Sequence, residues 1–293
     1  MTLRRKETLA AWLFLLPGFV GFAIFVFGAV VFSSVLSFFE WDMLTKPTFV
    51  GLRNFTKLFL ADKTFNLVFR NTLWFVLGTV PTRVLLGLIF ALILVRNVPG
   101  RTFFRAAIFL PVIIPTVTAA MVWRWIFNAD FGLLNDFLYQ IGVSKLPRWL
   151  SDPKWALVAI VILSVWKDVG FSTVMFMAGL QSIPTTVYEA AKLDGANAWK
   201  TFVHITLPLL SPTTFFVIVI NVISSFQVFD QAYVLTGGGP GNATNTIVYY
   251  IYNNAFQWFR MGYAAAIAWV LFGILFIATF VQFKYQRKWV YYE

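Results

Sequence analysis

The sequence has no cysteine, a single histidine (His204) and a small share of charged residues, 12% of 293. Without cysteine the chain can form no disulfide, no thiolate metal site and no cysteine nucleophile. One histidine also argues against a histidine-rich metal site or a histidine-based proton relay, and we expect His204 to be structural. Soluble domains carry about 25% charged residues, so the deficit excludes an ordinary soluble enzyme.

Apolar residues make up 59% of the chain, and the mean hydropathy is +0.76. These values are typical of a polytopic membrane protein, whose long uncharged segments face lipid. In a soluble protein the net charge of +11 would suggest a nucleic-acid partner. Here it indicates cationic loops beside a lipid bilayer. Because the sequence has no basic aromatic module of the RNA-binding type, we expect no nucleic-acid partner.

A helix needs about 20 consecutive apolar residues to cross the hydrocarbon core of a bilayer. Six segments meet this requirement: 9–39, 71–95, 106–127, 155–180, 207–229 and 261–283. We therefore expect an all-α polytopic membrane protein, with residues 1–293 forming one transmembrane domain of six helices. Prolines inside or beside the spans predict bent, closely packed helices, and these are Pro17, Pro81, Pro111, Pro115, Pro208 and Pro212.

Lysine and arginine are denser in one set of loops than in the other. They number 11 in the 56 residues of segments 1–10, 96–105, 181–206 and 284–293, but nine in the 89 residues of segments 40–70, 128–154 and 230–260. Because cytoplasmic loops carry the excess positive charge, we expect both termini to be cytoplasmic. The first segment imitates a signal peptide, but its apolar run is about twice the usual length. We therefore expect an uncleaved first span.

The loop 181–206, between the fourth and fifth spans, has the local sequence of two short helices. Thr186 and Glu189 have the spacing of a capping box. Gly195 is a natural helix stop, and Asn197 can cap the helix that follows. From these residues alone, the loop is predicted to be an interfacial pair of helices that connects two spans.

The same loop resembles the EAA loop of the membrane subunits of bacterial ABC importers. Glu189-Ala190-Ala191 is followed after three residues by Gly195, and after nine more by Ile205-x-Leu207-Pro208. Other segments are similar to the sugar-importer branch of that family: Phe49-Val50-Gly51-Leu52-x-Asn54-Phe55, Phe109-Leu110-Pro111, Trp123-x-Trp125, Thr236-Gly237-Gly238-Gly239-Pro240 and Met261-Gly262-Tyr263-Ala264-Ala265-Ala266. The resemblance covers about residues 10–285.

The resemblance implies that the loop is a coupling helix, which sits in a groove of a separate ATP-hydrolysing subunit. The implied coupling residues are Tyr188, Glu189, Ala190, Ala191, Asp194 and Gly195. The implied partners are a second homologous permease, two ABC ATPase subunits and an extracytoplasmic solute-binding protein, all at a bacterial cytoplasmic (inner) membrane. The sequence has no G-x-x-x-x-G-K-[ST] loop. We therefore expect a non-enzymatic chain that binds no cofactor or metal, with ATP and magnesium held by the ATPase subunits.

Polar residues inside the fourth and fifth spans form a candidate solute path. Such groups are costly in lipid and usually face the interior of the helix bundle, and the resemblance implies a solute path between these two spans. The candidates on one face of the fourth span are Ser164, Asp168 and Phe171, and those on one face of the fifth are Asn221, Ser224 and Ser225, with Gln227 and Asp230 further out. The alternative is that they only pack helices through hydrogen bonds. For Asp168, the alternative is an ion pair with Lys167 or Arg83.

We therefore expect one permease subunit of a binding-protein-dependent ABC importer for a sugar or oligosaccharide, because amides, hydroxyls and an aromatic ring suit a sugar. An importer of the same type for glycerol phosphate or another polyol is an alternative, although Arg83 and Arg124 are the only arginines inside the expected spans that could bind a phosphate. An ion-coupled secondary transporter is a second alternative, but it leaves the coupling-loop signature unexplained. Trp258, Phe259 and Arg260, before the sixth span, are candidates for contact with an external partner.

Overall fold

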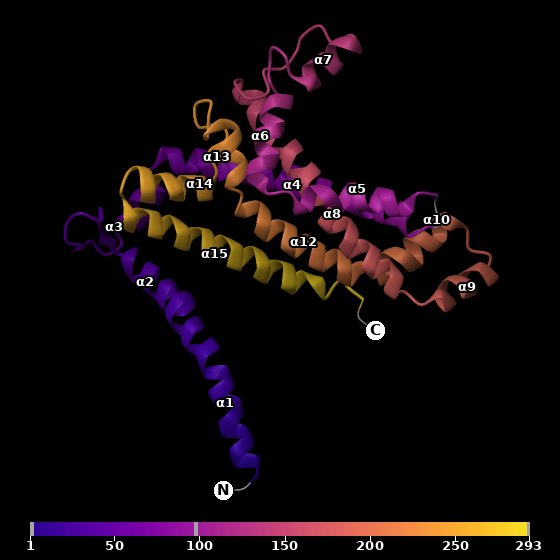
Figure 1. Cartoon of the computed structure of the whole chain (residues 1–293), viewed down its shortest axis with the longest axis horizontal. Coiled ribbons are helices and arrows are strands. Elements are labelled where there is room, and N and C mark those ends of the chain that lie inside the picture. The colour runs from indigo at the N-terminus through magenta and orange to yellow at the C-terminus, as the bar shows by residue number, and fades with distance from the viewer. Residues whose placement is uncertain (1–2, 97–98, 292–293) are drawn as a thin grey trace. The chain divides into compact units, whose positions relative to one another are not determined.

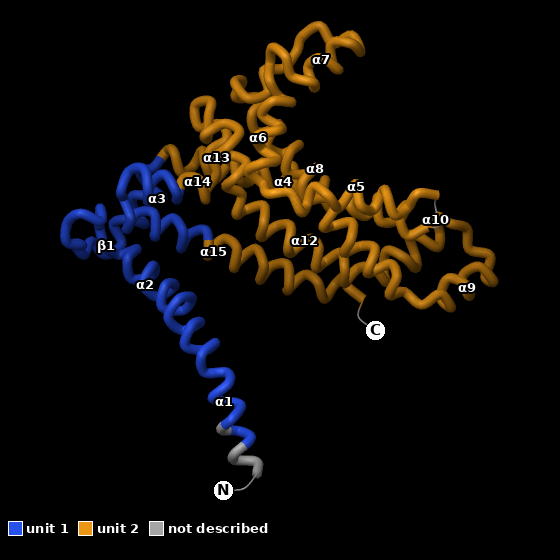
Figure 2. The backbone as a smooth tube through the Cα atoms, in the orientation of Figure 1, with its two compact units in different colours: residues 1–62, 251–271 blue, residues 63–250, 272–293 orange. Residues whose placement is uncertain are grey.

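The computed structural model describes every residue except 1–2, 97–98 and 292–293. The chain divides into two compact units, shown in different colours in Figure 2. Unit 1 consists of residues 1–62 and 251–271, and unit 2 of residues 63–250 and 272–293. The expectation of an all-α protein is confirmed, because in the described residues the only strands are one short antiparallel pair.

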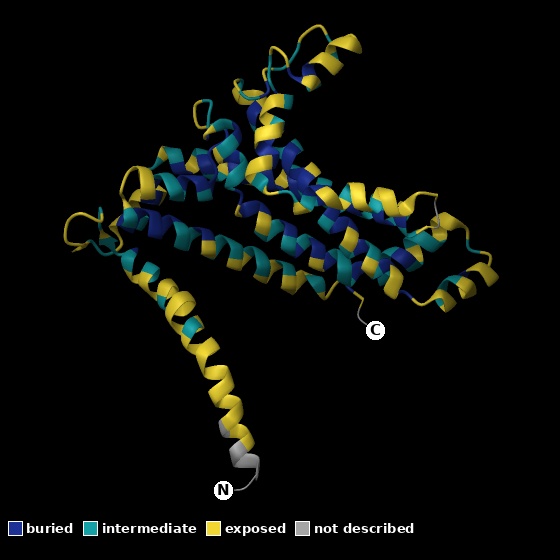
Figure 3. Ribbon diagram, viewed as in Figure 1, coloured by how far each residue is buried: buried dark blue, intermediate teal, exposed yellow. Residues whose placement is uncertain are grey.

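Unit 1 begins with one long apolar helical segment. Its elements are α1 (Leu3–Gly21), the π-helix η1 (Phe22–Gly28), α2 (Ala29–Leu36), β1 (Phe39–Glu40), β2 (Thr48–Phe49), α3 (Arg53–Leu60) and the π-helix η3 (Asn253–Gln257). The two strands pair with Phe39 opposite Phe49. None of residues 10–36 is buried, as the exposed colour of α1 and α2 in Figure 3 shows. The apolar surface of this segment is therefore available to lipid.

Unit 2 is built around long helices that pack side by side. Its elements are α4 (Lys63–Val95), α5 (Arg101–Ile113), α6 (Thr116–Ile126), α7 (Leu133–Gln140), α8 (Pro153–Ser182), α9 (Thr185–Leu193), α10 (Ala198–Thr201), η2 (Phe202–Thr206), α11 (Leu207–Leu209), α12 (Ser211–Phe226) and α13 (Asp230–Thr236). Helices α14 (Ile247–Tyr252) and α15 (Met261–Gln286) each belong partly to unit 1 and partly to unit 2. Figure 1 shows α9 and α10 at one end of the long helices of unit 2 and α13 at the other.

Four helical segments of the described chain are long and apolar enough to cross a membrane: Ala10–Leu36, Lys63–Val95, Pro153–Ser182 and Met261–Gln286. Two further pairs of helices meet the same test together but are bent, by 103° between α5 and α6 and by 62° where Ala198–Leu209 meets α12. The count reaches the expected six if each bent pair is one span.

Proline causes the sharpest of these bends. The segment 106–127, expected as one span, is divided because Ile114 is extended (ψ 131°), the conformation that a following proline favours. Pro115 is that following residue, and α6 begins directly after it. By contrast, Pro81 lies inside the unbroken helix α4. The contact between α4 and α8 is the most extensive one between any two elements of the described chain.

The contact between α5 and α8 depends on a glycine. A Cβ atom added at Gly170 in α8 would lie 2.3 Å from the carbonyl oxygen of Ile108 in α5, which is too close for any real contact. We expect Gly170→Ala to destabilise the folded chain by about 1–3 kcal/mol, the usual effect of overpacking. Thermal unfolding in detergent measures it. The matched control is Gly273→Ala, since a Cβ at Gly273 in α15 meets nothing within 4 Å; equal stability of the two variants would contradict the expectation.

Candidate functional site

The loop between α8 and α12 forms two short helices, as the sequence predicts, but its capping differs. Pro184 is the N-cap of α9, and no side chain caps that helix. The capping box predicted for Thr186 and Glu189 is therefore wrong, because the helix already begins at Thr185 and Thr186 lies in its first turn. The other two predictions are confirmed. Gly195 ends the helix at φ +71°, and the side chain of Asn197 caps α10 by accepting a hydrogen bond from the Lys200 amide at 2.8 Å.

The six predicted coupling residues divide between two sides of the loop. Tyr188 is half-buried and shares a hydrogen bond with the Thr206 hydroxyl at 3.3 Å, and Ala191 is buried. These two residues face the chain itself. The other four are exposed, namely Glu189, Ala190, Asp194 and Gly195. Sequence reasoning missed Leu193, which is 90% exposed beside them. The sequence could have indicated Leu193, because it is an apolar residue within the Glu189–Gly195 motif.

A charge pair joins α4 to α8. The Arg83 guanidinium donates to the Asp168 carboxylate at 2.6 Å, and also to the Ser164 carbonyl oxygen at 3.0 Å. The Arg83 side chain is 3% exposed and that of Asp168 36%. This confirms the ion-pair alternative for Asp168 and selects Arg83 as its partner. Lys167 points elsewhere, because its ammonium donates to the Val112 carbonyl oxygen at 3.4 Å.

A polar pocket of about 340 Å³ opens beside this pair, between α4, α6, α8, α12 and α13. Four of the eight predicted path residues line it: Asp168, Ser224, Gln227 and Asp230. It is also lined by residues that sequence reasoning did not place in the path, namely Phe75, Arg83, Thr116, Lys167, Val228, Phe229 and Gln231. The sequence did not indicate Thr116 or Gln231, because the bend between α5 and α6 places Thr116 at the pocket and the start of α13 places Gln231 there. Arg83 and Lys167 were visible as charges inside spans.

The other four predicted path residues lie outside the pocket lining. Ser225 is buried, and its hydroxyl lies 3.1 Å from that of Thr79 and accepts from Arg83 at 3.3 Å. The Asn221 amide donates to the Ser172 hydroxyl at 3.1 Å, which is the packing role named as the alternative. Ser164 is fully buried behind Arg83, and the ring of Phe171 is partly buried.

The pocket offers neutral and charged groups for recognition. Ser224, Gln227 and Gln231 supply hydroxyl and amide groups, and Phe75 and Phe229 supply aromatic rings. Lys167 belongs to neither of the two ion pairs found in the described residues. In the same described part of the chain, no three His, Cys, Asp or Glu side chains are grouped to hold a metal ion. The arrangement therefore suits a ligand that forms several hydrogen bonds.

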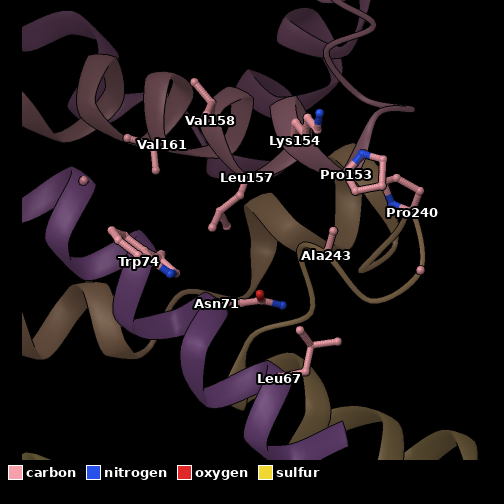
Figure 4. Close-up of a pocket in the computed structure, with 12 residues that line it drawn as sticks. Leu67, Asn71, Trp74, Pro153, Lys154, Leu157, Val158, Val161, Pro240 and Ala243 are labelled. Atoms are coloured by element: carbon pink, nitrogen blue, oxygen red, sulfur yellow. The ribbon is translucent and has the colours of Figure 1, made fainter.

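A larger pocket of about 590 Å³ lies between α4, the start of α8 and the loop that contains Pro240 (Figure 4). Its lining is largely apolar, including Leu67, Trp74 and Val158. The Asn71 side chain at this pocket is already engaged, because its amide donates to the carbonyl oxygens of Asn242 and Asn245 at 2.7 and 3.1 Å. This pocket holds none of the predicted path residues and is poorly suited to a polar solute.

Comparison with known proteins gives a consistent result. Residues 83–290 match the family described as binding-protein-dependent transport system inner membrane component. The chain is 38% identical over 292 residues to the probable ABC transporter permease protein YesP of Bacillus subtilis, covering 99% of this chain and 94% of that protein. It is 36% identical over 289 residues to the trehalose/maltose transport system permease protein MalF of Thermococcus litoralis, covering 97% and 96%.

A solved structure shows the same fold. It is that of a bacterial alginate ABC transporter in complex with alginate pentasaccharide-bound periplasmic protein. The TM-score is 0.82 at 24% identity, covering 97% of this chain and 96% of the matched one. Together with the bent apolar helices and the exposed loop helix α9, these similarities establish that the chain belongs to the inner-membrane permease components of binding-protein-dependent ABC importers, which are non-catalytic subunits.

Proposed function

We propose that this chain and a second, homologous permease together form the path for a sugar or oligosaccharide delivered by an extracytoplasmic binding protein. The observation that carries the solute class is the 340 Å³ pocket beside Arg83 and Asp168, with its amides, hydroxyl and aromatic rings. Sugar hydroxyls need hydrogen bonds, and the C–H faces of a sugar pack on rings. A trehalose/maltose relative and an alginate transporter of the same fold support this class.

Two ATPase subunits supply the energy in this proposal, and α9 is the contact through which they act. Glu189, Ala190 and Leu193 all lie on the exposed part of α9. A leucine that is 90% exposed beside a carboxylate suits a partner surface with an apolar groove and a basic residue. Tyr188 and Ala191 hold the helix against the rest of the chain, so that movement of α9 is transmitted to α8 and α12.

The proposed orientation places the α9 end of unit 2 and both termini in the cytoplasm. The density of lysine and arginine supports it, through the positive-inside preference. Tyr291 also lies by the start of α12, which is cytoplasmic in this proposal, because its amide donates to the Ser211 hydroxyl at 2.9 Å. In this orientation α13 and the polar pocket lie toward the outer side, where a binding protein delivers its solute.

Lys167 favours a second candidate, an importer of the same type for an acidic saccharide or glycerol phosphate. Lys167 is a buried residue that lines the pocket, and within the described chain its ammonium donates only the long hydrogen bond to the Val112 carbonyl oxygen at 3.4 Å. Arg83 gives less support to an acidic solute, because Asp168 already neutralises its charge. Uptake of a labelled neutral oligosaccharide, in competition with an acidic one, separates the two candidates.

Purification of the tagged chain from its native membrane tests the function. We expect an ATPase, a second six-span subunit and a solute-binding protein to co-purify. We also expect proteoliposomes of the complex to take up solute only when ATP is present on the side of the membrane that carries the ATPase subunits. A stable complex without an ATPase would contradict the proposal and favour an ion-coupled transporter. Screening neutral, acidic and phosphorylated sugars against the co-purified binding protein identifies the solute class.

A further inference from the structure

Unit 1 contains a polar pocket of about 500 Å³ at the ends of its membrane helices. It is formed by the β1–β2 hairpin, α3 and the segment that leads into α15. The helix α2 ends at Leu36 and α15 begins at Met261, where the Met261 amide donates to the Trp41 carbonyl oxygen at 2.9 Å. These loops are external in the proposed orientation. The pocket therefore faces the compartment in which a solute-binding protein works.

Many polar groups of this pocket are already used by the fold. The Trp41 indole donates to the Thr45 carbonyl oxygen at 3.0 Å. The Asn54 amide donates to two carbonyl oxygens of the hairpin region, at 2.8 and 2.9 Å. One oxygen of Asp42 accepts from the Thr45 amide and hydroxyl and from the Leu44 amide, and these bonds lower the pKa of Asp42. The Trp41 indole, the Asn54 amide and this one oxygen of Asp42 therefore shape the pocket, and the second oxygen of Asp42 stays available to a partner.

Three cations remain: Lys46, Lys57 and Arg260. None of them belongs to either ion pair of the described residues. Lys57 lies over the Tyr263 ring, 5.1 Å from its centroid, and Arg260 lies over the Trp258 ring at 5.8 Å. Ring contacts of this kind hold a cation in place without neutralising it. Lys57 and Arg260 therefore present positive charge in fixed positions, and Lys46 adds a third cation on the exposed hairpin.

Exposed apolar side chains lie on the same hairpin and on the same segment before α15 as these cations. Leu44 is 87% exposed and Phe49 71% exposed on the hairpin, and Trp258 and Phe259 are exposed on the other side of the pocket. Two residues here have left-handed backbones that side chains rarely adopt, Met43 at φ +69° and Phe259 at φ +50°. Such strain is concentrated at functional surfaces. Apolar groups next to charges outside a membrane helix are typical of a surface that contacts a protein.

We propose that this pocket and its apolar rim are a docking surface for an acidic patch of the solute-binding protein, with carboxylates of that protein seated between Lys57, Arg260 and Lys46. The inference rests on the proposed function. A protein fits better than a lipid headgroup because the pocket also contains Glu40 and Asp42. Those carboxylates repel a phosphodiester but can accept a lysine or arginine of a protein partner. Mixed charges of this kind give a protein interface its specificity.

Charge reversal in the assembled importer tests the docking surface. The importer is reconstituted in phosphatidylcholine nanodiscs, and its affinity for the co-purified binding protein is measured at several salt concentrations. We expect Lys57→Glu and Arg260→Glu each to weaken binding about tenfold, and the salt dependence of binding to fall in both variants. Lys46→Glu, on the exposed hairpin, is a third variant that does not depend on a ring contact within the fold.

The matched control is Arg53→Glu, one helical turn before Lys57 on α3. Arg53 is exposed, does not line the pocket and is 3.9 Å from Glu40. We expect its effect on affinity to be less than about twofold. A charge swap in an acidic residue of the binding protein should restore binding to Lys57→Glu.

Each of the other outcomes overturns the docking site. Unchanged affinity in all three pocket variants does so directly. Loss of bound phosphatidylglycerol from nanodiscs that contain it, with unchanged protein affinity, makes the occupant a lipid headgroup. Loss of the second permease from the variant complexes makes the surface a subunit interface. A wild-type importer that binds no binding protein overturns the proposed function as well, whereas normal wild-type binding with insensitive variants overturns the docking site alone.

Discussion

Replacing Gly195 with valine is expected to reduce ATP-driven uptake about tenfold while the importer still assembles. Gly195 has φ +71°, and a Cβ there would meet nothing within 4 Å. The effect therefore comes from the backbone and not from a clash. The left-handed conformation costs an L-residue roughly 1–2 kcal/mol, and every 1.4 kcal/mol is a tenfold change in a population. The turn that connects α9 to α10 would open, and closure of the ATPases would no longer move the spans.

Uptake and ATP hydrolysis, measured together in proteoliposomes, check this prediction. We expect hydrolysis to continue without matching uptake in Gly195→Val. Asparagine tolerates the left-handed conformation, so Gly195→Asn is the matched control and should keep most of the uptake. Glu189→Lys should uncouple transport in the same way, because it reverses a charge on the exposed part of α9. Normal coupling in both Gly195→Val and Glu189→Lys would remove α9 from the mechanism.

Breaking the Arg83–Asp168 pair is expected to lower both stability and transport. Breaking a fully buried pair costs about 3–5 kcal/mol. Because the Asp168 side chain is 36% exposed, we expect about half of that from Arg83→Met, since solvent screens part of the charge that is left. Loss of the guanidinium also removes one hydrogen bond each from the Ser164 carbonyl oxygen and the Ser225 hydroxyl at the back of the pocket. We expect ATP-driven uptake by Arg83→Met to fall together with its free energy of unfolding.

The double variant Arg83→Met/Asp168→Asn separates charge from packing. It carries no uncompensated carboxylate, so we expect it to unfold at a higher temperature than Arg83→Met alone. A double-mutant cycle with Asp168→Asn gives the coupling free energy between the two side chains. Additive effects of the two single changes would show that the 2.6 Å contact contributes nothing beyond the separate residues.

Most features set by local sequence were predictable, although the capping box of Thr186 and Glu189 was not formed, and features set by tertiary neighbours were less so. The stop at Gly195 and the cap at Asn197 follow from the preferences of single residues, and both predictions are confirmed. For Asp168 the sequence narrowed the ion-pair partner to Lys167 or Arg83, because few other charges lie inside spans, and the structure selects Arg83. The shared face of Asn221 and Ser225 was visible as helical spacing, but spacing does not reveal which neighbour a face meets.

The pocket boundaries show the same limit. Thr116 enters the site only because the chain turns by 103° between α5 and α6, and proline marks the place of such a bend but not its direction. In the same way, the pocket of unit 1 joins Lys57 to Arg260, residues that the sequence separates by most of the chain. The sequence pointed to Trp258, Phe259 and Arg260 as exposed candidates but not to the hairpin they meet.

The separation of Arg83 from Asp168 also sets an order on biosynthesis. The two residues are 85 positions apart, and at about 5–20 residues per second a ribosome needs roughly 4–17 s to make the stretch between them. During that time the second span carries an arginine whose counter-charge does not yet exist, at a cost of about 2.5–3.5 kcal/mol if it lies at the bilayer centre. We therefore expect α4 to stay beside the translocon, or to keep its arginine in contact with water, until α8 has been synthesised and can pack against it.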